Sequence, residues 1–131
     1  MDFKNILPDP NDPSLRKSPE LIMRRLMDDI AAKYSGHISA TFTSSSQVFE
    51  DGASSVLDYT FYLIFLKQDN FSYPLFTATC MMQDGAYPLV IRSHYGPPID
   101  YGKAADGEAF EKIIELIFKE ERTRNVILSM Y

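Results

Sequence analysis

Apolar side chains in residues 18–36 recur every three or four positions, which is the spacing of one face of a helix. Ser18, Pro19 and Glu20 stand in the order typical of an N-cap and a first helical turn. Gly36 follows the last apolar position and suits the end of a helix. We therefore predict an amphipathic helix here, with its apolar stripe facing a core.

The period changes to two between His37 and His94, where apolar and polar side chains alternate and aromatic and β-branched residues are frequent. Asp84-Gly85 is typical of a hairpin turn, and Pro88 favours an edge position for the strand that follows. We predict four half-buried strands, in residues 37–44, 56–67, 74–82 and 87–94.

A second helical pattern follows Asp106, a plausible N-cap, with an apolar stripe that runs from Phe110 to Phe118. The last ten residues also carry apolar side chains at helical spacing, and Thr123 is a possible second cap. We read a short final helix there, with a strand over residues 125–131 as the alternative.

The predicted order is one helix, four strands joined by short turns, and one or two helices. Short connections make neighbouring strands antiparallel. The fold class is therefore α+β: a two-layer sandwich with an N-terminal helix, a four-stranded antiparallel meander and one or two C-terminal helices.

Three prolines in residues 1–17 forbid regular structure, so we expect an extended arm before a single domain of residues 18–131.

Composition narrows the classes of function. The 131 residues suit one domain, and 13 basic against 18 acidic residues give a net charge of −5, which disfavours nucleic-acid binding. The single cysteine, Cys80, has no partner for an intramolecular disulfide and suits a reducing compartment. With neither a signal-like start nor an apolar run of membrane-spanning length, we expect a cytoplasmic protein away from membranes.

One face of the predicted sheet is left without helices, and we call it the open face. Alternation places Asp58 and Tyr62 there, and the fourth strand puts Arg92 and His94 on one face together. Tyrosine and arginine are favoured anchors of protein interfaces. The face is either a binding platform or an ordinary solvated surface.

Asp58 interrupts an otherwise apolar strand. Its carboxylate could pair with Arg92 or orient His94 for acid–base chemistry, or it could simply be exposed near the strand's start. His37 and His94 lack the spacing of a metal motif, so we predict no metal and no cofactor. Cys80 lies in a strand interior and is read as a buried, inert thiol.

Residues 91–107, IRSHYGPPIDYGKAADG, gather polar and aromatic side chains between the last strand and the following helix. They contain neither GxGxxG nor GxxxxGK[ST]. Asp100, Tyr101 and Lys103 could line a pocket above the start of the helix. The alternative is a crossing loop stiffened by Pro97-Pro98.

These features favour a non-catalytic module that binds a protein partner or itself through the open face. Tyr62 and Tyr95 would be aromatic anchors, with Asp58 and Arg92 fixing orientation. An acidic inhibitor or immunity-type protein that masks a basic enzyme is one version. The alternatives are a subunit of a larger assembly, or a small-molecule binder or enzyme at the border of the sheet and the 95–106 loop. That site would use Asp58, Arg92, His94 and Tyr101.

Overall fold

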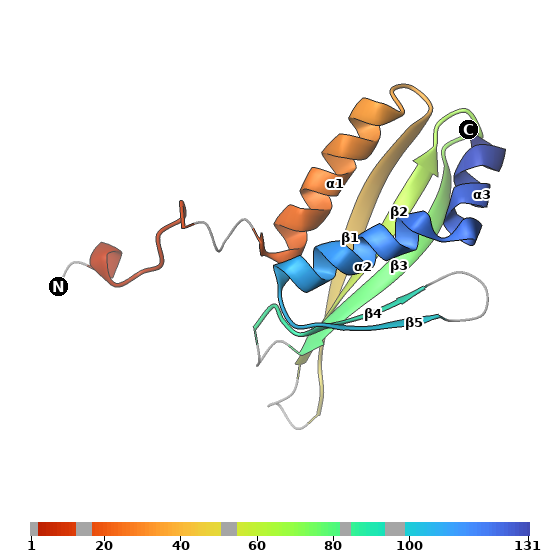
Figure 1. The fold of residues 1–131 in the computed structure, drawn as a ribbon. Coiled ribbons are helices and arrows are strands. Elements are labelled where there is room, and N and C mark those ends of the chain that lie inside the picture. The colour runs from red at the N-terminus through yellow and green to blue at the C-terminus, as the bar shows by residue number, and fades with distance from the viewer. Residues whose placement is uncertain (1–2, 13–16, 51–54, 82–84, 94–98) are drawn as a thin grey trace.

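The computed structural model describes residues 3–12, 17–50, 55–81, 85–93 and 99–131 of the chain (Figure 1). Its regular elements are η1 (Phe3–Asn5), α1 (Pro19–Lys33), β1 (Ile38–Val48), β2 (Ser55–Phe65), β3 (Phe71–Met81), β4 (Leu89–Ser93), β5 (Asp100–Ala104), α2 (Gly107–Lys119) and α3 (Glu121–Met130).

The strands form one antiparallel sheet in the order β1-β2-β3-β4-β5, so each strand pairs with its neighbour in sequence. Helices α1, α2 and α3 all lie on the same side of this sheet (Figure 1). The two-layer α+β sandwich, its N-terminal helix, its antiparallel meander and two C-terminal helices are thereby confirmed.

The sheet has five strands, and the prediction of four was wrong. The additional strand is β5, which lies in the stretch read as either a loop site or a crossing. Its main chain pairs with β4, where Leu89 lies opposite Ala104 and Ile91 opposite Gly102. Since β4 is paired on both sides, the edge position expected from Pro88 is also wrong; Pro88 precedes the strand and removes no bond from its ladder.

The core fills the space between the sheet and the helices. Phe61, Leu63 and Phe65 alternate along β2 and are at most 1% exposed, and they belong to the same cluster as Met23 of α1 and Phe110 of α2. Burial of each such side chain stabilises the fold by about 1.5–3 kcal/mol, so this layer dominates the stability of the domain.

Local capping explains where the helices begin. The Ser18 hydroxyl accepts a hydrogen bond from the Leu21 N–H, and the Asp106 carboxylate accepts one from the Ala109 N–H at 2.8 Å, as the sequence predicted. The final segment is a helix and not a strand. Its N-cap is Glu120 rather than Thr123, because the chain is extended at residue 120 and Thr123 is already a buried helical residue.

Ion pairs link the N-terminal parts of α1 and α2. Arg25 of α1 forms an ion pair of 2.9 Å with Glu111 of α2, and Lys17 forms one of 2.6 Å with Glu108. Residues 3–12 are exposed, and η1 lies apart from the sheet and helices (Figure 1). No helix in the described part of the chain is long and apolar enough to span a membrane.

Candidate functional site

The open face is the side of the sheet that carries no helix (Figure 1). Along β2, Tyr59 and Phe61 are buried under the helices, so Asp58, Thr60 and Tyr62 face the other way. These three residues are only half-buried, because no element of the described chain covers them.

The pairing of residues between neighbouring strands shows which side chains of the other strands share this face. Thr60 lies opposite Thr43 on one side and Thr77 on the other, and Thr77 lies opposite Arg92. Arg92 in turn lies opposite Asp100. All five strands therefore contribute to one row, which runs from hydroxyl groups at the β1 edge to a basic and an acidic residue at the β5 edge.

Asp58 belongs to the neighbouring row, opposite Ser45 and Thr79. The Thr79 hydroxyl donates a 2.5 Å hydrogen bond to the Asp58 carboxylate. Arg92 lies opposite Thr77, two positions along β3 from Thr79, and no ion pair joins it to Asp58 among the residues that the structure describes. The Thr79 hydroxyl thus holds the Asp58 carboxylate in place. The second carboxylate oxygen can still accept a hydrogen bond from another donor.

Apolar side chains complete the open face. Val56 and Ile64 of β2 are half-buried, as are Pro74 of β3 and Val90 of β4, while Met81 is exposed. Pro74 lies opposite Tyr62 across a bulge in the β2–β3 pairing. The surface therefore combines apolar groups, hydroxyl groups and charges of both signs.

Tyr101, the candidate from the 91–107 stretch, lies on the helix side. The β4–β5 register shifts between Ile91 and Arg92, which leaves Tyr101 as an extra residue in β5. Its hydroxyl donates a 2.8 Å hydrogen bond to Glu120 at the junction of α2 and α3. Burial, and next this bond to Glu120, raises the pKa of Tyr101.

The structure consequently does not bring all candidates together. Asp58, Tyr62 and Arg92 share the open face, while Tyr101 contacts the helices beyond the sheet. His94 and Tyr95, and with them the proposed pairing of Asp58 with His94, lie outside the described residues.

Cys80 lies beneath the sheet on the core side. It is 3% exposed, and burial, followed by the charge of Asp58, raises the pKa of its thiol. A raised pKa disfavours the nucleophilic thiolate, consistent with a structural cysteine. Within the described residues no three His, Cys, Asp or Glu side chains gather as metal ligands would.

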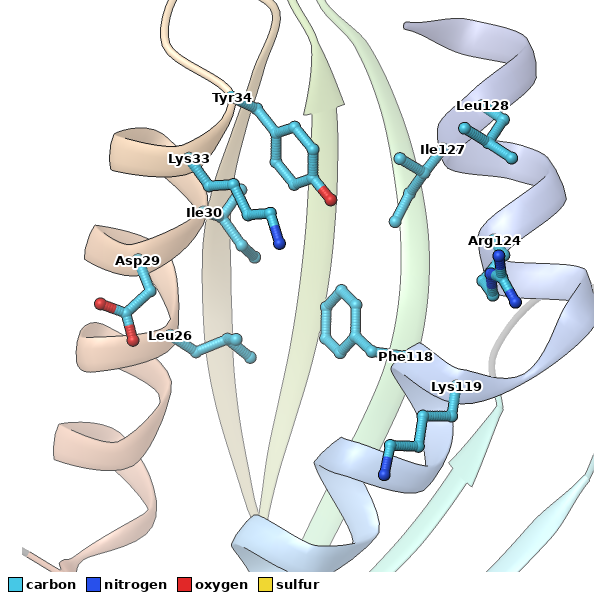
Figure 2. A pocket seen from close by; sticks show the side chains of 10 residues that line it. All are labelled: Leu26, Asp29, Ile30, Lys33, Tyr34, Phe118, Lys119, Arg124, Ile127 and Leu128. Atoms are coloured by element: carbon cyan, nitrogen blue, oxygen red, sulfur yellow. The ribbon is translucent and has the colours of Figure 1, made fainter.

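Sequence reasoning missed a groove of about 540 Å³ on the helix side, between α1 and the α2–α3 pair (Figure 2). Leu26 and Ile30 line it from α1, and Phe118 and Ile127 line it from α2 and α3. Their helical spacing is that of a core stripe, and Ile30 and Ile127 do belong to the buried core, while Leu26 and Phe118 pack against it and are half-buried. The one signal in the sequence is the run of charged residues 119–122, at which α2 ends.

The groove exists because α3 does not continue the path of α2. The extended backbone at Glu120 redirects the chain, and the C-terminal half of α1 then faces α3 across a gap instead of packing against α2 (Figures 1 and 2). The pocket of 540 Å³ falls in the size range of small-molecule sites.

No protein-family model, curated protein or solved structure matches this chain.

Proposed function

We propose that this protein is a non-catalytic interaction module that self-associates through its open face. The observation that carries the proposal is the position of all three α-helices on one side of the sheet, which leaves half-buried apolar side chains uncovered on the other. Sheets of this kind are commonly solvated on one face, but that face is then mainly polar.

The size of the face is adequate for a stable contact. Three strands of eleven residues and two of five give a face on the order of 700 Å², from the usual strand rise and spacing. A typical specific interface buries about 800 Å² on each partner. Face-to-face packing of two sheets at about 10 Å would bury most of this surface.

Charge favours a second copy of the chain over a basic partner. The strands present two acidic residues on this face, Asp58 and Asp100, and two basic ones, Arg92 and Lys103. The chain as a whole carries −5, so its excess acidity lies elsewhere. A basic enzyme would be drawn to an acidic face, whereas a balanced face can complement itself about a two-fold axis.

The test is the mass in solution of the wild type and of Tyr62→Glu, by size-exclusion chromatography with light scattering over a hundredfold range of concentration. Tyr62 stands in the middle strand of the three long ones, and a buried carboxylate there would be costly. We expect a concentration-dependent dimer for the wild type and a weakening of at least roughly tenfold for Tyr62→Glu.

Leu116→Glu is the matched control. Leu116 is 59% exposed on α2, on the helix side, so the same change of charge should leave the dimer intact. A wild type that is monomeric throughout would overturn the proposal. A dimer that survives Tyr62→Glu would also overturn it, and would direct attention to the long, uncharged edge strand β1.

A further inference from the structure

The groove between α1 and α3 is a second surface, on the opposite side of the sheet from the open face (Figures 1 and 2). We infer that it binds a small anionic amphiphile: a carboxylate attached to an apolar chain, of which a medium-chain fatty acid is the model. Three features of the groove support this inference, namely its apolar floor, its basic rim and its size.

The floor of the groove is apolar. Leu26 and Ile30 project from α1, the ring of Phe118 occupies the middle, and Ile127 projects from α3 (Figure 2). Ile30 and Ile127 are buried, whereas Leu26 and Phe118 are only half-buried, so part of their apolar surface is still available to a ligand. Covering such surface yields about 25 cal/mol per Å².

The rim is basic although the protein is acidic. Among the described residues that line the groove, Lys33, Lys119 and Arg124 are basic and Asp29 alone is acidic. Lys119 forms an ion pair with Glu115, but no ion pair involves Lys33 or Arg124 among the residues that the structure describes. Figure 2 shows the Lys33 side chain reaching into the groove and the Asp29 carboxylate turned away from it.

Lys33 reaches into the groove from α1, and Arg124 lines the facing wall on α3 (Figure 2). The Tyr34 hydroxyl also points into the groove, where it can donate a hydrogen bond. The Lys33 ammonium and the Tyr34 hydroxyl lie at one end of the apolar floor and Arg124 lines the facing wall, an arrangement that suits a carboxylate head with its chain lying over Phe118 and Leu26.

The dimensions of the groove favour a small ligand over a helix of a partner protein. The groove volume of about 540 Å³ falls within the range of small-molecule sites. Side-chain contacts also flank the groove. The Arg25–Glu111 ion pair joins α1 to α2 at one end, and at the other the ring of Tyr131 stacks on His37 at 4.2 Å and meets Tyr34 edge-on at 6.0 Å.

The test is a titration of the isotopically labelled full chain with dodecanoate, kept below its micelle concentration, and followed by amide chemical shifts. We expect saturable shifts confined to the facing parts of α1, α2 and α3. Dodecanol carries the same chain without the charge, and we expect it to bind at least roughly tenfold more weakly.

The double variant Lys33→Gln/Arg124→Gln should reduce dodecanoate affinity by at least roughly tenfold and leave dodecanol binding unchanged. Lys112→Gln, at an exposed position of α2 outside the groove, is a control for the loss of one basic side chain and should bind like the wild type. Because all three side chains are exposed, we expect folded variants. No groove shifts in the wild type, or equal binding of dodecanoate and dodecanol, would overturn the inference.

Discussion

At the scale of single residues, Tyr101 has a structural role that its position in a Gly- and Pro-rich stretch concealed. One additional residue in β5 turns its side chain from the open face to the helices, where it donates to Glu120. Glu120 is also the residue at which α2 ends and α3 begins. The bond therefore ties the edge of the sheet to the turn that shapes the groove.

We expect Tyr101→Phe to reduce the free energy of unfolding by about 1–2 kcal/mol, since it removes a partly buried hydrogen bond to a carboxylate. Tyr62→Phe is the control, because it deletes the same hydroxyl from the open face and should change stability little in the monomer. Urea unfolding at low protein concentration measures both. Equal losses in the two variants would contradict the role assigned to the Tyr101 hydroxyl.

At the scale of elements, the starts of α1 and α2 and the inner strands were predictable from sequence because local chemistry determines them. Ser18 and Asp106 cap the helices they were expected to cap. Strand β5 was not predictable, because Asp100, Gly102 and Lys103 have low strand propensity. The strand forms only because β4 offers a free edge, and that is information from tertiary structure.

The same distinction between local chemistry and tertiary structure applies to the candidate site residues. Alternation along β2 was enough to place Asp58 and Tyr62 on one face, and the strand order then added Arg92. The groove could not be found in this way, since Phe118 and Ile127 have the same spacing whether they contact a neighbouring helix or face a gap. Whether these side chains contact a neighbouring helix or face a gap is determined by the change of chain direction at Glu120.

The cap of α2 gives a test at this scale. Asp106→Ala removes the hydrogen bond to the Ala109 N–H and a negative charge at the positive end of the helix, so we expect a loss of about 1 kcal/mol. Asp106→Asn keeps the cap and should cost only a few tenths of that. The midpoint of urea unfolding distinguishes them, and similar losses in both variants would show that charge matters more than capping.

At the scale of the whole molecule, the sheet separates two surfaces of different character. The open face carries acidic and basic residues in equal number, and the groove on the helix side is rimmed mainly by basic ones. Phe61 and Phe76 are stacked between them at 5.2 Å in a core that is fully buried. A close-packed layer of this kind has low compressibility, and no ligand contact on either side reaches through it.

We therefore expect self-association and dodecanoate binding to be independent of each other. Coupling requires a ligand to have different affinities for two states of the protein, and no groove residue lies on the open face. Tyr62→Glu should bind dodecanoate within about twofold of the wild type, and saturating dodecanoate should leave the dimerisation constant unchanged within the same margin. The light-scattering series measures the dimerisation constant with and without dodecanoate, and the chemical-shift titration measures dodecanoate affinity in both proteins. Each result checks the other because coupling is reciprocal. A shift of tenfold or more would mean that the helices and the open face move together, and that the sheet transmits a change instead of separating the two surfaces.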